Sequence, residues 1–329
     1  MGSNNRPSED SLIARYFAPM AGEGGLGLED DAARLTPRPG HDLVLTVDAL
    51  VERVHFLPED APGSIARKAL GVNVSDLAAK GADPAGFLLS LALRDDWTEG
   101  WLAAFATGLG EASRDFGCPL LGGDTVRARG PLTLSVTAFG EVPSGRMVLR
   151  TTARAGDWVC VTGTIGDAAL GLGLRADPAW AALLSVDEKV HLADRYLHPR
   201  PRHALATALR DHASAAMDVS DGLAGDLAKM MRAGGVSAFV DLDRVPLSPA
   251  AAKAVETSPD LLDLAVTGGD DYEILCTVPE KNLDTLRKEA DTVGIALSVI
   301  GRVVSGQDRP VFRINGLERR YDVGSYQHF

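Results

Sequence analysis

The residues best suited to chemistry are aspartates in five separated segments of the 329-residue chain. The segments are 29–33, 46–48, 74–77, 122–125 and 218–222, and each places an acid beside an apolar or glycine-rich stretch. One aspartate in such a place is ordinarily a helix cap or turn residue, because its side chain accepts hydrogen bonds from nearby amides. Five together favour a magnesium and phosphate site, since Mg²⁺ prefers carboxylate oxygens and is shared with substrate phosphates.

Two acidic stretches in the second half add detail. In 218–222 the first acid, Asp218, closes an expected strand, and Asp221 lies near a helix start, where Ser220 and backbone amides could meet phosphate. The stretch 268–273 reads Gly-Gly-Asp-Asp-Tyr-Glu before another expected strand. Its paired glycines allow a ligand close to the backbone, but an ordinary turn explains the same residues.

Other nucleotide and catalytic signatures are weak or missing. The sequence has no P-loop of the form G-x-x-x-x-G-K-[ST]. Residues 22–27 match G-x-G-x-x-G, but no convincing strand precedes them, which disfavours a dinucleotide-binding fold. His55 alone is typical of a packed histidine, and the arginines Arg127, Arg146 and Arg150 are either surface charges or phosphate clamps.

The overall charge restricts the partners of the chain. A formal net charge of -12 argues against general affinity for nucleic acid or an anionic membrane, and requires cations between the protein and any phosphate. Simple solubility also explains the acidity. Three scattered cysteines and the lack of an N-terminal apolar segment or membrane-length apolar run predict a soluble, cytoplasmic protein.

The hydrophobic pattern predicts two α/β domains, residues 1–150 and 151–329. Expected helices are 11–17, 64–80, 97–116, the residues after 221, and 281–293. Expected strands are 43–48, ending on Asp48, and 132–139, 158–163, 215–219, 238–242, 272–278 and 297–300. Residues 120–125 read as an apolar run, a glycine turn and an aspartate.

Five motifs in a fixed order carry a resemblance to a known family. They are 73–84 (NVSDLAAKGADP), 122–125 (GGDT), 161–167 (VTGTIGD), 218–223 (DVSDGL) and the ending 326–329 (YQHF). Over nearly its whole length the chain resembles the thiamine-monophosphate kinase family. That family is related to aminoimidazole ribonucleotide synthetase and selenophosphate synthetase.

The resemblance implies ATP-dependent phosphorylation of thiamine phosphate to thiamine diphosphate by direct transfer, assisted by several Mg²⁺ ions. It implies a homodimer formed through the N-terminal sheet and an active site in the interdomain cleft. The metal positions it indicates are Asp31, Thr46, Asp48, Asp76, Asp124, Asp218 and Asp221. Asp76 and Asp124 are the expected catalytic ligands, and ATP contacts fall on Gly123, Asp124, Arg150 and Ser220.

The implied thiamine phosphate contacts are His55 and Asp270, with Tyr321 and Val323 near the thiamine rings. Val323 stands where a relative has tryptophan, and Tyr321 is the candidate substitute. Glu29 replaces a glycine of the family turn, and Val47 replaces a hydroxyl residue. Alternatives are another ATP-dependent enzyme of the same superfamily, such as a purine-biosynthetic synthetase, or a nucleotide-binding regulator without turnover.

Overall fold

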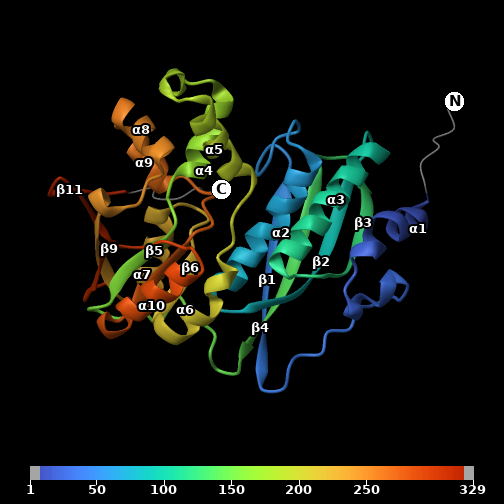
Figure 1. Ribbon diagram of the computed structural model, residues 1–329, viewed down its shortest axis with the longest axis horizontal. Coiled ribbons are helices and arrows are strands. Elements are labelled where there is room, and N and C mark those ends of the chain that lie inside the picture. The colour runs from blue at the N-terminus through green and yellow to red at the C-terminus, as the bar shows by residue number, and fades with distance from the viewer. Residues whose placement is uncertain (1–7, 322–329) are drawn as a thin grey trace. The chain divides into compact units, whose positions relative to one another are not determined.

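The structure is a computed structural model that describes residues 8–321 of the chain (Figure 1). The chain divides into two compact units. The first comprises Met1–Leu77 and Asp83–Gly145, and the second comprises Ala78–Ala82 and Arg146–Phe329. Each unit has a β-sheet of its own, as expected when each builds a separate hydrophobic core.

In the described part of the first unit, four strands form a sheet in the order β1-β4-β2-β3. Their bounds are His41–Val51 (β1), Asp83–Arg94 (β2), Leu120–Ala128 (β3) and Thr133–Pro143 (β4). Strand β4 pairs antiparallel with β1 and β2, whereas β2 and β3 are parallel. The parallel pair follows from the helix between its strands, because a crossover returns the chain to the same end of the sheet.

Helices α2 (Pro62–Ala79) and α3 (Glu99–Phe116) cover one face of this sheet (Figure 1). Thr98 begins α3 by accepting a hydrogen bond from the amide of Trp101, and Gly117 ends it in the left-handed region. The helices cross at glycines: a Cβ on Gly108 would lie 2.4 Å from the Cα of Gly63. The close crossing therefore depends on the missing side chains.

The opposite face of the first-unit sheet exposes apolar side chains. On β1, Val44 is 5% exposed, whereas its neighbour Leu45 is 61% exposed and Val47 is 60% exposed. Alternate strand residues point to opposite faces, so one face joins the core and the other meets solvent. The chain before β1 adds α1 (Glu9–Leu12), a π-helical turn Ile13–Phe17 and the 3₁₀ segments Ala18–Met20 and Glu23–Leu28.

The described residues of the second unit form a seven-stranded sheet in the order β11-β10-β7-β9-β5-β8-β6. The strands are Trp158–Thr162 (β5), Ala215–Asp218 (β6), Ser237–Asp241 (β7), Ile274–Val278 (β8), Leu297–Val304 (β9), Val311–Ile314 (β10) and Leu317–Arg319 (β11). The β10–β7 pair is parallel, and the other pairings are antiparallel.

Helices cover both faces of the second sheet. They are Asp167–Gly173 (α4), Val186–Leu197 (α5), Ala206–His212 (α6), Leu223–Gly234 (α7), Pro249–Thr257 (α8), Leu261–Thr267 (α9) and Glu280–Thr292 (α10). On β5, Val159 and Val161 belong to the core cluster of α7 and α9, while Cys160 belongs to that of α6 and α10. Burial on both faces explains why β5 reads as a continuous apolar run.

The predicted α/β class is confirmed, and most predicted elements have counterparts in the structure. The sequence pattern did not predict the strands β2, β10 and β11 or the helices α4, α5, α6, α8 and α9. No helix within residues 8–321 is long and apolar enough to cross a membrane. The division of the chain at residue 151 stays a prediction.

Three local predictions were wrong. Residues 122–124 are not a turn but lie inside β3. Glycine is needed at 123 because a Cβ there would stand 2.0 Å from the carbonyl oxygen of Leu89 on β2. The glycine allows close strand approach and does not mark a turn. Asp48 lies within β1 and not at its end. Strand β8 starts at Ile274, since Tyr272 has a left-handed φ of 50°.

The glycine crossing of α2 and α3 can be tested with Gly108→Ala. The added methyl group has no space, so we expect the free energy of unfolding to fall by about 1–3 kcal/mol in urea titrations. Gly100→Ala in the same helix is the matched control, because nothing lies within 4 Å of its Cβ position. It should retain or gain stability, and equal effects of the two substitutions would contradict the crossing.

Candidate functional site

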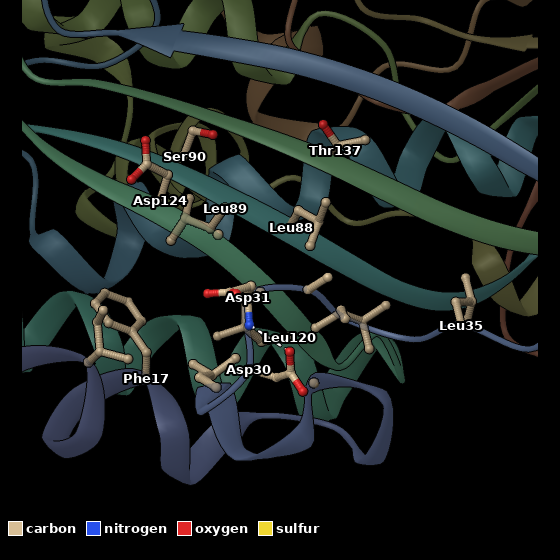
Figure 2. A pocket seen from close by; sticks show the side chains of 18 of the residues that line it. Phe17, Asp30, Asp31, Leu35, Leu88, Leu89, Ser90, Leu120, Asp124 and Thr137 are labelled. Carbon is tan, nitrogen blue, oxygen red and sulfur yellow. Dashed lines mark hydrogen bonds between the residues drawn. The ribbon is translucent and has the colours of Figure 1, made fainter. Parts of the chain in front are cut away.

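A cavity of about 740 Å³ in the first unit brings together three of the predicted site residues (Figure 2). They are Asp31, Gly123 and Asp124, with Asp30 beside them. Apolar side chains form much of the remaining wall, including those of Phe17, Leu35, Leu43, Leu45, Leu88, Leu121 and Phe139. An apolar pocket with a few carboxylates at one place has the composition expected of a small-molecule site.

The sheet register places Asp124 on the exposed face of the first-unit sheet. Asp124 on β3 pairs with Ser90 on β2, and Ser90 pairs with Ser135 on β4. Ser135 in turn pairs with Ala49 on β1. Paired residues point to the same side of a sheet. Figure 2 shows Asp124 and Ser90 next to each other, with Asp30 and Asp31 on the segment that borders the same pocket.

Thr46, Asp48 and Asp76 belong to the other, helix-covered face. Thr46 and Asp48 are in register with Ala138 and Val136, which are fully buried. The Thr46 hydroxyl donates to Oδ2 of Asp76 on α2 at 2.5 Å. The backbone of Asp48 donates to Oδ1 of Asn73 at 3.1 Å. The structure therefore pairs Thr46 with Asp76, but it puts Asp124 on the opposite face from them.

The carboxylates thus occur in ones and twos. Within residues 8–321, no three His, Cys, Asp or Glu side chains form a group that could hold a metal ion. Mg²⁺ usually keeps several waters and binds through one or two carboxylates plus substrate phosphates. Asp31 and Asp124 both line the pocket. Two carboxylates suit a Mg²⁺ ion that also binds nucleotide phosphates, whereas an ion held by protein ligands alone would need more of them.

His55 lies on a short loop after β1. Its Nδ1 accepts a hydrogen bond from the amide of Val51 at 3.0 Å, so the proton of the neutral ring is on Nε2. Its carbonyl oxygen accepts from Nζ of Lys68 at 3.0 Å, and Lys68 is only 2% exposed. The loop is therefore fixed from both sides.

In the second unit, Asp218 is the last residue of β6, and Ser220 and Asp221 lie between β6 and α7. Asp226, which is fully buried in the first turn of α7, accepts hydrogen bonds from the amides of Ser220 and Asp221 at 3.0 and 2.9 Å. Lys229 bridges Asp226 and Asp221. Burial raises the pKa of Asp226, and the ammonium group of Lys229 opposes that shift. Asp226 thus organises the turn.

Asp270 lies beside this turn. Its amide donates to the carbonyl oxygen of Ser220 at 2.9 Å, and the amide of Tyr272 donates to that of Val219 at 2.8 Å. The structure therefore brings the predicted substrate contact Asp270 next to the predicted ATP contact Ser220. Both belong to the second unit.

The remaining predicted residues are less closely grouped. Arg150 is exposed after the first-unit boundary. Tyr321 donates its hydroxyl hydrogen to Oδ1 of Asp263 at 2.9 Å and meets Phe312 edge-on. That side chain is already packed against the second-unit core. Val323 lies outside the described residues.

Sequence reasoning missed the residues that hold these groups in place. Asp226 and Lys68 were not singled out, and the buried carboxylates Asp271 and Glu273 were named only as part of the acidic stretch 268–273. Asp226 had one usable signal, namely an acid in the first turn of a helix that follows a polar loop. The partners of Lys68 and Glu273 are distant in sequence, so no local spacing could have revealed them.

Comparison with known proteins identifies the family. Residues 29–142 match the family described as AIR synthase related protein, N-terminal domain, and residues 154–312 match its C-terminal domain. The thiamine-monophosphate kinase of Caulobacter vibrioides is 42% identical over 310 residues, which is 92% of this chain and 85% of the relative. The chain belongs to the thiamine-monophosphate kinase family.

Solved structures agree with that assignment. The crystal structure of thiamine-monophosphate kinase from Stenotrophomonas maltophilia K279a is 39% identical with a TM-score of 0.82, and the match covers 93% of this chain and 95% of that one. AaThiL complexed with AMPPCP and TMP is 28% identical with a TM-score of 0.78, covering 97% and 94%. The kinase-family relatives thus share both sequence and fold with this chain over nearly full length.

The role of Asp226 can be tested with Asp226→Ala. The change leaves two amides and Lys229 without a buried acceptor, so we expect the free energy of unfolding to fall by about 2–3 kcal/mol in chemical denaturation. Asp260→Ala is the control, because Asp260 is exposed before α9 and makes no capping bond. A loss no larger than that of the control would show that Asp226 does not hold the turn.

Proposed function

We propose that this chain transfers the γ-phosphoryl group of ATP to thiamine monophosphate, giving thiamine diphosphate and ADP. The observation that carries the proposal is similarity over nearly full length to thiamine-monophosphate kinases, 42% identical over 92% of the chain in one case. The relative solved with AMPPCP and TMP supports the same pair of substrates. A pocket with Asp31 and Asp124 on its wall is consistent with a metal–nucleotide site.

The proposed ligands are distributed over both units. In residues 1–150, the proposed Mg²⁺ ligands are Asp31, Thr46, Asp48, Asp76 and Asp124. The proposed ATP contacts there are Gly123, Asp124 and Arg150, and His55 is the proposed contact for thiamine phosphate. Residues 151–329 would supply Asp218 and Asp221 to Mg²⁺, Ser220 to ATP, and Asp270, Tyr321 and Val323 to thiamine phosphate. The proposal therefore requires both units to contribute to one reaction.

The chemistry needs positioning more than proton transfer. A phosphate monoester has a second pKa of about 6, so the attacking oxygen of thiamine phosphate is largely deprotonated at neutral pH. A strong general base is unnecessary, and the main barrier is bringing two polyanions into line. Bound Mg²⁺ would neutralise charge on the transferring phosphoryl group.

The protein's own residues would set the geometry of that transfer. The hydroxyl of Thr46 holds one carboxylate oxygen of Asp76 and so restricts the orientation of that carboxylate. Asp226 fixes the amides of Ser220 and Asp221 in the second unit. Ligands fixed in this way lose little conformational entropy when substrate binds.

A cytoplasmic homodimer is part of the same proposal. On the same sheet face but outside the pocket, Val47 on β1 exposes 60% of its surface and Val126 on β3 exposes 49%. Such an apolar face is typical of a protein interface, and a second copy could cover it. Cys118, Cys160 and Cys276 are buried free thiols, as expected in a reducing compartment.

The first test is product analysis with ATP, Mg²⁺ and thiamine phosphate. We expect thiamine diphosphate and ADP to form in equal amounts by chromatography, and free thiamine as acceptor to give no product. ADP release with a purine-biosynthetic intermediate but not with thiamine phosphate would contradict the proposal. ATP binding without turnover of any thiamine compound would instead support a regulator.

The second test is Asp76→Asn, assayed across a Mg²⁺ titration. Losing the charge weakens a metal ligand, so we expect turnover to fall at least tenfold at moderate Mg²⁺, the equivalent of about 1.4 kcal/mol. Asp284→Asn on the exposed side of α10 is the control and should behave as wild type. Near-normal turnover of Asp76→Asn at moderate Mg²⁺ would remove Asp76 from the metal site.

A further inference from the structure

The segment Gly268–Glu273 alternates between buried and accessible side chains. Asp271 is 1% exposed and Glu273 is fully buried, whereas Asp270 and Tyr272 are half-buried. The segment also contains two non-glycine residues in the left-handed region, with φ of 74° at Asp270 and 50° at Tyr272. Such conformations cost on the order of 1 kcal/mol each and persist only where surrounding contacts hold them.

The carboxylate of Asp271 makes one set of those contacts. Its Oδ2 accepts from the amide of Gly166 at 2.7 Å, and its Oδ1 accepts from the amide of Ala168 at 3.3 Å. These amides belong to the start of α4, and Gly166 lies within the motif 161–167, to which the proposed reaction assigns no role. Asp271 therefore ties the strained segment to a separate helix.

Arg195 of α5 makes the second set of contacts that hold the segment. Its Nη2 donates to the carbonyl oxygen of Asp271 at 3.2 Å and to Oε1 of Glu273 at 2.9 Å. Arg195 is 3% exposed, so its charge is held inside the second unit. One guanidinium group thus binds both the backbone and a side chain of the segment.

Glu273 completes the network. It also binds the guanidinium of Arg202, and its Oε2 accepts from the hydroxyl of Thr162 at 2.7 Å. Two arginines therefore share the one buried carboxylate of Glu273, while the carboxylate of Asp271 accepts backbone amides. A buried network of this kind resists local opening, since breaking the Arg195–Glu273 pair leaves buried charge without a partner.

Rigidity at these residues is transmitted to the neighbouring turn. Asp270 and Tyr272 donate their amide hydrogens to Ser220 and Val219, and the amide of Val219 donates to the carbonyl oxygen of Glu273 at 2.8 Å. The network thus fixes the backbone of Asp270 relative to Ser220. The side chain of Asp270 does not need to enter the buried network to be placed by it.

We propose that Arg195 and Asp271 are positioning residues that hold the strained Gly268–Glu273 segment and so present Asp270 to the phosphate-bearing acceptor. The role of Asp270 as an acceptor contact rests on the proposed function. The holding of the segment rests on the hydrogen bonds and φ values given above. The two parts have separate readouts.

The first readout is hydrogen exchange, which needs no substrate. In Asp271→Asn, an amide group replaces one of the two acceptor oxygens, so the backbone around Asp270 should open more readily. We expect the amides of Asp270 and Tyr272 to exchange roughly tenfold faster than in wild type. Arg195→Lys, which keeps the charge but loses the forked geometry, should show the same local change.

The second readout is the kinetic constants for the two substrates. Asp271→Asn should raise the KM for thiamine phosphate roughly tenfold while the KM for ATP changes less than twofold, because the variant misplaces a contact to one substrate only. A loss of folded protein would instead lower kcat without separating the two KM values. Adding Asp270→Asn to Asp271→Asn should raise the KM for thiamine phosphate little further, since both substitutions remove the same contact.

The matched controls are Asp194→Asn and Arg200→Lys. Asp194 of α5 and Arg200, which follows α5, form an accessible ion pair, with 2.8 Å between Nη2 of Arg200 and Oδ2 of Asp194. They should leave both readouts unchanged. Wild-type exchange rates at Asp270 and Tyr272 in both Asp271→Asn and Arg195→Lys, or equal KM increases for both substrates, would overturn the proposal.

Failure of the proposed function would look different. If the wild-type chain does not phosphorylate thiamine phosphate, that function fails, and the exchange rates alone decide whether Arg195 and Asp271 hold the segment. If wild type is active, the exchange and kinetic results must change together in the variants. Faster exchange with unchanged KM values would contradict the claim that the held segment serves the acceptor.

Discussion

Repulsion between carboxylates is the constraint on which the candidate site depends. Within the described residues, no three His, Cys, Asp or Glu side chains form a group that could hold a metal, and specific neighbours stabilise several of the aspartates. Asp76 accepts from a threonine hydroxyl, Asp221 pairs with Lys229, and Asp226 accepts backbone amides. Neighbours of this kind reduce the repulsion between carboxylates, and a cation that arrives with phosphate would reduce it further.

The main elements of the fold were readable from the sequence because their patterns are local. Helix α3 has an apolar stripe and a threonine cap, and β5 is a continuous apolar run. Strand β3 was misread at Gly122 and Gly123, because glycine is typical of both turns and closely packed strands. Only the neighbouring strand, whose Leu89 carbonyl leaves no space for a Cβ at Gly123, decides between them.

The candidate site was predicted in part for a similar reason. The family resemblance supplied Asp31, Asp124 and Ser220, but not the faces on which these residues lie. Sheet register puts Asp124 opposite Thr46 and Asp48, which no spacing along the chain could show. Arg195 and Glu273, 78 residues apart in the chain, meet only after the second unit has folded.

The claim that the aspartates act through a metal is tested most directly by calorimetric titration of ATP into the wild-type chain. One titration contains excess Mg²⁺ and the other contains EDTA, at the same ionic strength. The account predicts binding with Mg²⁺ and none measurable with EDTA, because an acidic pocket repels bare triphosphate. Equal affinity in the two titrations would contradict it.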